Sequence, residues 1–279
     1  MSGVAPTTPL RDRYVAPALM GVVNVTPDSF SDGGRFLDPA AAIEEGLRHA
    51  AEGAAIVDVG GESTRPGSEG ISLELELERV LPVIEGIRAG AQVALSIDTS
   101  KAAVAEPAIR AGASMVNDVT ALGDPAMADL VASLGVDVCL MHMLGTPRTM
   151  QEDPRYDDVV QEVADWLCDR VERACDAGVA RERICVDPGI GFGKNMAHNL
   201  SLIAHLDVIG ARCGTPVLIG LSRKSFLGRI MGDMDRDRTI ATVAANVEAV
   251  RRGAFMLRVH DVGVHRDALA AVAAIAGAR

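Results

Sequence analysis

Short apolar runs alternate with longer amphipathic segments along almost the whole chain, and this alternation limits the folds open to it. Each run is a few residues long and rich in Val, Ile, Leu and Met. Continuous apolar runs of this length are typical of strands buried on both faces, as the strands of parallel sheets are. The predicted strands are residues 18–25, 55–59, 93–97, 114–116, 136–141, 184–186, 216–221 and 255–259.

The segments between these runs show helical spacing of their apolar residues. Glycine follows several of them, at the position where a helix commonly ends in a left-handed residue. A strand-helix unit repeated eight times predicts a parallel sheet, and eight strands favour closure into a (β/α)8 barrel, the TIM barrel, over a doubly wound open sheet. The predicted helices are residues 39–52, 73–89, 101–111, 125–134, 157–177, 238–252 and 262–276.

The length of the chain is consistent with one domain. Its 279 residues are close to the roughly 250 of a typical barrel. We expect a single catalytic domain over residues 18–279, with the active site at the carboxyl ends of the strands, where enzymes of this fold carry their sites. Residues 1–17 contain prolines and charges and no long apolar run, so we expect them to form a flexible N-terminal extension.

The composition argues against several function classes. Lys and Arg number 27 against 38 Asp and Glu, a net charge of −11, so the chain lacks the basic surface that binds nucleic acid or an anionic membrane. No apolar stretch reaches the ~18 residues of a membrane span. The five cysteines show no C-x-x-C spacing, which favours reduced thiols and a cytoplasmic location. We expect neither nucleic acid nor a membrane as a partner.

Polar side chains stand at the ends of the predicted strands, where the sequence changes abruptly from aliphatic to polar. Taken alone, an aspartate at a strand end often only caps the next helix. In a barrel, all strand ends converge on one face, so eight polar ends together predict a site. The side chains concerned include Asn24, Asp58, Asp98, Asn117, His142, Asp187, Lys224, Arg258 and His260.

One group of these residues suits an anion. Arg65, Arg258 and His260 would project toward one mouth of the barrel, and two guanidiniums with an imidazole can grip a phosphate or a diphosphate. Asn24 and the nearby Asp28 offer hard oxygen ligands. Such ligands suit a Mg²⁺ ion that is shared with substrate phosphates.

A second group suits a flat heterocycle. Asp98, Asn117, Asp187 and Lys224 supply donors and acceptors in mostly apolar surroundings, as a site for a ring edge requires. The sequence has no Gly-x-Ser-x-Gly turn and no cysteine beside a plausible base, so a covalent acyl mechanism has no support. The residues therefore predict a polyphosphorylated heterocycle as the substrate.

The segments at the strand ends also resemble the motifs of a known family. Residues 24–34, Asn-Val-Thr-Pro-Asp-Ser-Phe-Ser-Asp-Gly-Gly, and 58–67, Asp-Val-Gly-Gly-Glu-Ser-Thr-Arg-Pro-Gly, resemble the two signature segments of the dihydropteroate synthases, pterin-binding enzymes of folate biosynthesis. The resemblance covers about residues 18–262, with one departure at Leu144, where the family pattern has a polar residue. The other matching segments are residues 96–99, 117–119, 141–143, 149–151, 187–194, 222–228 and 258–262.

The resemblance implies a role for each matching residue. Asp28, Arg65, Asp98 and Lys224 would be catalytic. The pterin would be held by Asp98, Asn117, Met141, Asp187, Phe192 and Lys224. The diphosphate would be held by Asn24, Thr64, Arg65, Arg258 and His260, with Asn24 binding through Mg²⁺. The second substrate, 4-aminobenzoate, would be held by Phe30, Pro66, Lys224 and Ser225.

The resemblance implies a transferase that joins 6-hydroxymethyl-7,8-dihydropterin diphosphate to 4-aminobenzoate. The reaction would be SN1-like: diphosphate departs, the dihydropterin ring carries the resulting cation, Asp98 stabilises it, and the arylamine attacks. A homodimer and sensitivity to sulfonamides are implied as well. Two alternatives stay open at this point. A pterin-binding methyltransferase shares the barrel but serves a corrinoid partner and needs no diphosphate grip, and a paralogue could bind the pterin without catalysis.

Overall fold

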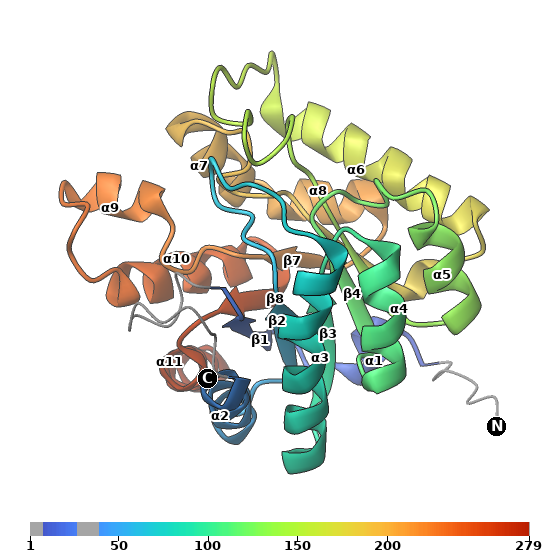
Figure 1. Cartoon of the computed structure of the whole chain (residues 1–279). Coiled ribbons are helices and arrows are strands. Elements are labelled where there is room, and N and C mark those ends of the chain that lie inside the picture. Colours follow the sequence, from blue (N-terminus) through green and yellow to red (C-terminus); the bar gives the residue numbers. More distant parts are fainter. Residues whose placement is uncertain (1–7, 27–38, 279) are drawn as a thin grey trace.

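A closed barrel of eight parallel strands, in the order of the chain, forms the centre of the molecule (Figure 1). The structure is a computed structural model, and it describes residues 8–26 and 39–278. The first and last strands pair directly, with Met20 opposite Arg258, which closes the ring and confirms the predicted barrel. The strands are β1 (Ala18–Asn24), β2 (Ile56–Gly60), β3 (Ala94–Asp98), β4 (Met115–Asp118), β5 (Asp137–Met141), β6 (Ile184–Asp187), β7 (Val217–Ile219) and β8 (Ala254–Val259).

Helices surround the barrel (Figure 1). All seven predicted helices are present within two residues of their expected bounds, and helices α1, α7, α8 and α9 are additional. In the described ranges, no helix combines the length and the apolar character needed to cross a bilayer. The helices are α1 (Leu10–Arg13), α2 (Pro39–Ala51), α3 (Leu73–Gly90), α4 (Ala102–Ala111), α5 (Met127–Leu134), α6 (Val159–Asp176), α7 (Met196–Ala204), α8 (Leu206–Cys213), α9 (Ser225–Met231), α10 (Thr239–Arg251) and α11 (Val262–Gly277).

The strands divide the apolar residues into two cores. Side chains that alternate along each strand point to opposite faces. One set, such as Val57 and Leu95, packs outward against the helices in the larger cluster. The other set fills the inside of the barrel and includes Met20, Ile56, Met115, Cys139, Cys185, Leu218 and Met256.

The alternation also places the polar residues of the strand ends. Two residues after an inward apolar position, the side chain points inward again, one layer closer to the carboxyl ends of the strands. Four strands show this step from an apolar to a polar inward residue. The pairs are Ile56 with Asp58, Met115 with Asn117, Cys185 with Asp187, and Met256 with Arg258. A polar layer thus lies directly above the apolar filling of the barrel.

The amino ends of the strands are covered by part of the N-terminal segment. Leu10 of α1 is fully buried and belongs to the cluster inside the barrel. Arg13 donates a hydrogen bond to Asp137, whose side chain is fully buried at the start of β5. Helix α1 is therefore anchored to the barrel through Leu10 and Arg13, within the segment for which the sequence suggested a loose extension.

The ion pair between Arg13 and Asp137 should contribute to stability. Arg13→Met leaves a buried carboxylate without its main partner, and losses of this kind cost about 3 kcal/mol or more. We expect the urea midpoint of unfolding, followed by circular dichroism, to fall clearly. Arg11→Met removes an exposed guanidinium of the same helix and is the matched control. Equal midpoints for the two variants would show that α1 does not stabilise the barrel.

Candidate active site

The polar layer brings residues from four strands into one hydrogen-bonded cluster. Arg258 donates from Nε to Oδ2 of Asp58 at 2.6 Å and from an Nη to Oδ2 of Asp98 at 2.7 Å. Asn117 donates from Nδ2 to the same Oδ2 of Asp58 at 2.9 Å. Asp98 and Asn117 are also neighbours in the register of β3 and β4. The closure of the barrel is what makes β8 meet β2 and β3 here.

The electrostatics of this cluster are set by two carboxylates and one guanidinium. Burial raises the pKa of Asp98 to about 7, and Asp58 adds to the rise, while Arg258 opposes it. Arg258 stays charged, because both carboxylates raise its pKa against the effect of burial. Asp98 is therefore the group of this cluster that titrates near neutral pH.

A second arm of the site extends from β6 and β7. Asp187 is buried, which raises its pKa, and the nearby ammonium of Lys224 opposes the rise. Burial lowers the pKa of Lys224 to about 8, and Asp187 opposes the fall. The ammonium donates to the carbonyl of Ile190 and lies 4.9 Å from the centre of the Phe192 ring.

The remaining pterin residue, Met141, is buried at the end of β5, opposite Asp187 in the register. It packs beside a carboxylate that also accepts a hydrogen bond from the backbone of Gly189 at 2.7 Å. The adjoining strand ends thus bring together an apolar side chain, a hydrogen-bond acceptor and a cation that lies over an aromatic ring. This combination suits the flat, polar-edged heterocycle that the sequence predicts.

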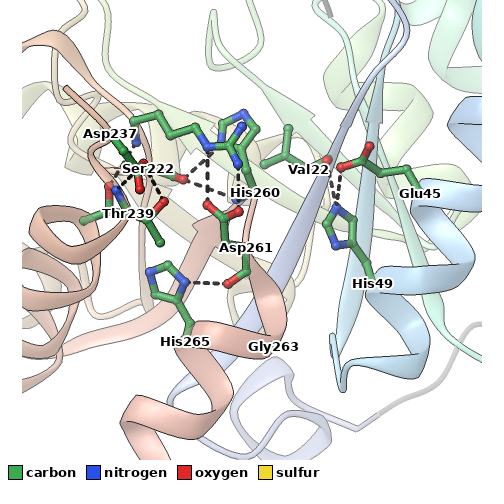
Figure 2. Close-up of polar contacts among 12 residues, drawn as sticks. Val22, Glu45, His49, Ser222, Asp237, Thr239, His260, Asp261, Gly263 and His265 are labelled. Carbon is green, nitrogen blue, oxygen red and sulfur yellow. Dashed lines mark hydrogen bonds and ion pairs between the residues drawn. The ribbon is translucent and has the colours of Figure 1, made fainter. Parts of the chain in front are cut away.

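His260 follows β8 and pairs with Ser222, which follows β7 (Figure 2). Oγ of Ser222 accepts from the backbone N–H of His260 at 3.2 Å and lies 2.9 Å from its Nδ1. The hydroxyl of Ser222 can also donate its own proton to Nδ1, and in that arrangement the imidazole carries its proton on Nε2. Burial and the nearby Arg258 lower the pKa of His260 to about 4, so the ring is neutral at pH 7.

Two other histidines in Figure 2 have ring nitrogens that contact backbone carbonyls. His49 on α2 lies 3.1 Å from the carbonyl of Val22, and His265 on α11 lies 2.7 Å from the carbonyl of Asp261. Both are buried. These contacts give both rings a structural role between helices and strand ends.

The loop after β2 carries Thr64, Arg65 and Pro66. Arg65 and Pro66 are exposed, and Thr64 is partly buried. The loop contacts the one after β5 through a hydrogen bond from the backbone of Gly67 to the carbonyl of Pro147, at 2.9 Å. The loop therefore lies beside the carboxyl ends of the strands, with its diphosphate candidates at its tip.

The base of this loop is tied by Lys101, which follows β3. Its ammonium donates to Glu62 at 2.5 Å, to the fully buried Glu76 at 2.6 Å and to the carbonyl of Ile71 at 3.0 Å. Glu62 lies near the start of the loop and Ile71 near its end. One side chain thus holds both stems, while the residues between them reach outward.

Several predicted residues are placed without a described contact to the cluster. Asn24 ends β1, opposite Gly60 in the register, and Ser225 is exposed at the start of α9. Asp28 and Phe30 lie outside the described residues. Within the described ranges, no three His, Cys, Asp or Glu side chains gather as metal ligands. At Leu144, where the family pattern is polar, the backbone N–H still contacts the carbonyl of Phe192 at 3.5 Å.

Sequence reasoning did not assign three residues that the structure places in or beside the site. Asp58 was noticed at a strand end, and the inward alternation that places Asn117 also places Asp58. Ser222 also follows a predicted strand and Lys194 ends a motif segment, but the sequence gave neither contact, because their partners His260 and His142 are far away in the sequence. Two surface hollows of about 250 and 730 Å³ lie at the opposite, amino ends of the strands, so side-chain chemistry and not cavity size locates the site.

Comparison with known proteins gives a consistent result. The family model of the pterin binding enzymes matches residues 20–260. Dihydropteroate synthase of Escherichia coli is 43% identical over 263 residues, which cover 94% of this chain and 93% of that protein.

Two solved structures are similar over nearly the whole chain. The dihydropteroate synthase of Xanthomonas albilineans with 4-aminobenzoic acid has a TM-score of 0.88 and 48% identity, covering 94% of each chain. That of Yersinia pestis in a sulfonamide drug complex has a TM-score of 0.90 and 42% identity, covering 100% of each chain. The chain belongs to the pterin binding enzyme family and, within it, to the dihydropteroate synthases.

Proposed function

We propose that the chain condenses 6-hydroxymethyl-7,8-dihydropterin diphosphate with 4-aminobenzoate, giving 7,8-dihydropteroate and diphosphate, in folate biosynthesis. The observation that carries this proposal is the cluster of Asp58, Asp98, Asn117 and Arg258 at one end of the barrel, with Asp187 and Lys224 beside it. A related protein from X. albilineans has been solved with 7,8-dihydropteroate, at 45% identity and a TM-score of 0.85. A corrinoid-dependent methyltransferase has no use for the diphosphate grip that Arg65, Arg258 and His260 would form.

Pterin recognition would depend on buried, oriented polar groups. The carboxylates of Asp98 and Asp187 accept hydrogen bonds from the donor edge of the ring. Asp58 fixes the amide of Asn117 by accepting from its Nδ2, which leaves the amide oxygen for the ligand. Phe192 and Met141 cover the ring faces, and Lys224 donates to a ring acceptor. Such groups discriminate strongly, because a wrong ligand leaves them unpaired in the interior.

The leaving diphosphate would be held by donors around the same mouth. Among the described residues, Arg258 uses two of its five N–H groups for Asp58 and Asp98, which leaves three that could bind phosphate oxygens. His260 adds its Nε2–H, and Thr64 and Arg65 approach from the loop after β2. Arg258 therefore serves both halves of the substrate, where the sequence alone assigned it to the diphosphate.

A Mg²⁺ ion fits this arrangement. The amide oxygen of Asn24, at the carboxyl end of β1, is a hard ligand of the type that Mg²⁺ accepts when it keeps most positions for water and phosphate oxygens. When bound, the ion would neutralise charge on the departing diphosphate. Asn24 and Asp28 are the residues of this chain that we propose to hold it.

The chemical step would need charge stabilisation more than a strong base. Loss of diphosphate leaves positive charge in the dihydropterin, and the carboxylate of Asp98 is placed to stabilise it inside a low-dielectric site. The arylamine is a weak base, so its attack depends on position. We propose that Lys224, Ser225, Pro66 and Phe30 hold its carboxylate and ring, and that the loops exclude water, which would otherwise hydrolyse the cation.

We further propose that the enzyme works as a homodimer. The support from this chain is that α10 and α11, two helices in contact, each carry an exposed apolar side chain that a subunit contact would cover. Ile240 is 84% exposed and Val264 is 49% exposed. The cytoplasmic location stays a prediction from the sequence.

The proposed activity has a direct test. Purified protein is mixed with the pterin diphosphate, 4-aminobenzoate and Mg²⁺, and 7,8-dihydropteroate and released diphosphate are measured by chromatography. We expect both products in equal amounts, and a loss of about 100-fold or more in kcat/KM for Asp187→Asn, because an amino group would face the donor edge of the ring. Arg110→Met, an exposed change on α4, is the control. Diphosphate release without pteroate would contradict the synthase.

The pH dependence of kcat/KM should follow Asp98 and Lys224. The site needs the carboxylate of Asp98, which exists above its pKa of about 7, and the ammonium of Lys224, which exists below its pKa of about 8. We expect activity to rise through pH 7 and to fall through pH 8, a narrow bell that reports the free enzyme.

Two variants identify the limbs of this profile. Asp98→Asn should have a much lower kcat/KM, and its pH profile should lack the acidic limb. Lys224→Arg should shift the alkaline limb to higher pH, because a guanidinium does not deprotonate in this range. An acidic limb that persists in Asp98→Asn would belong to the substrate diphosphate, and the assignment of Asp98 would be wrong.

The aminobenzoate site should form only after the pterin and diphosphate have bound. Pro66 and Arg65 lie at the exposed tip of one loop, so ordering that tip costs conformational entropy, which contacts with diphosphate can offset. We expect labelled 4-aminobenzoate in equilibrium dialysis to bind at least about tenfold more tightly when Mg²⁺, diphosphate and a pterin are present. Equal binding with and without them would show that the loop does not build this site.

A further inference from the structure

The chain has 24 arginines but only three lysines, and each lysine follows a barrel strand at the face that carries the site. A lysine differs from an arginine in its compact ammonium, which has three donors on one atom. Lys224 belongs to the pterin arm and Lys101 ties the loop after β2. Lys194, after β6, has no part in the mechanism given above.

Lys194 is enclosed by three polar partners. Its side chain is 2% exposed, and its Nζ lies 2.7 Å from Nδ1 of His142, 3.1 Å from the carbonyl of His142 and 3.0 Å from the carbonyl of Phe192. An ammonium can donate to all three, and a neutral amine can donate to the two carbonyls while its lone pair accepts from Nδ1–H of His142. Burial lowers the pKa of His142 to about 3, so its ring is neutral at pH 7. Burial also lowers the pKa of Lys194, and the three contacts hold its Nζ in place in either protonation state.

The amino group of Lys194 is the inner anchor of the loop over residues 189–194. Successive carbonyls of the loop accept bonds from different elements: Ile190 from Lys224, Gly191 from Gln151, Phe192 from Lys194, and Gly193 from Tyr156. The loop also lies so close to the one after β5 that a Cβ at Gly189 would come within 1.9 Å of the carbonyl of His142. The anchored loop fixes the Phe192 ring and the Ile190 carbonyl, the two groups that contact Lys224.

We propose that Lys194 is a positioning residue for pterin recognition, which it supports by holding Phe192 and Ile190 against Lys224. This role rests on the proposed function, in which Phe192 and Lys224 bind the pterin. Lys194 touches no reacting atom in this scheme. It acts through the loop, and an arginine could not replace it, because a planar guanidinium cannot make all three contacts from one atom in this cage.

The first test measures binding of the pterin half and of the diphosphate half of the substrate separately. Lys194→Met keeps the length of the side chain and removes the amino group. We expect the affinity for 6-hydroxymethylpterin, measured by calorimetry, to fall about tenfold or more, because Phe192 and Ile190 lose their fixed place. Binding of inorganic diphosphate with Mg²⁺ should change less than about twofold, since Arg258 and His260 do not contact the loop.

Matched variants exclude a general loss of stability or charge. Arg110→Met removes one positive charge from exposed α4 and should leave both affinities unchanged. Tyr156→Phe removes only the hydroxyl that bonds Gly193, so it should fold normally and weaken pterin binding about threefold, with diphosphate spared. If Lys194→Met does not fold, the pterin affinity of Tyr156→Phe is the deciding measurement. Pterin affinity equal to that of the wild type in whichever of these loop variants folds would overturn the role of Lys194.

A spectroscopic signature tests the cage in the unaltered protein. With ¹⁵N at the side-chain nitrogens of lysine, NMR should show that the protons on Nζ of Lys194 exchange most slowly of the three lysines and that its resonance shifts when 6-hydroxymethylpterin binds. Nζ protons at Lys194 that exchange like those of a surface lysine, or a resonance that does not respond to the pterin, would contradict the proposal. Wild-type protein that binds no pterin would refute the proposed function, and the role of Lys194 with it.

Discussion

The ion pairs of Arg258 with Asp58 and Asp98 are the interaction on which the site depends. They join β8 to β2 and β3 across the barrel, so they exist only when the ring is closed. Two carboxylates share one guanidinium that cannot lose its proton, and burial makes the excess negative charge costly. The structure accommodates this by leaving Asp98 with a raised pKa near 7, poised beside the place where we propose that positive charge develops.

Much of the fold follows from the sequence because parallel strands are continuously apolar and helices are amphipathic. The eight strands and seven longer helices were predicted within a few residues. Helices α7 and α8 were not, since both are short and they meet at His205, whose backbone is not helical, so no long period appears. Helix α9 has seven residues with Gly228 inside, which weakens its helical signal. The packing of α1 depends on Asp137, a partner more than a hundred residues away.

The site was predictable at the level of which residues face it, and less so at the level of which residues touch. Strand-end position and inward alternation identify Asp98, Asn117, Asp187 and Arg258. They do not show that Arg258 bonds Asp98, because that contact depends on barrel closure and strand register. Roles carried by loops are harder still. The assignments of Asp28 and Phe30 lie outside the described residues and stay predictions.

The two loops that flank the site differ in how the backbone is held, and this difference indicates that they have different roles in ligand binding. The loop after β6 has its carbonyls bonded one after another, so the pterin arm is preorganised and little entropy is lost when a ligand binds there. The loop after β2 is tied by Lys101 at its two stems, with an exposed tip between them. A preorganised site can bind a ligand on its own, whereas the exposed side chains at this tip lose conformational freedom when they engage one. The same anchoring chemistry, a lysine amino group among three polar partners, thus holds the whole loop on one side and the two stems of an exposed loop on the other.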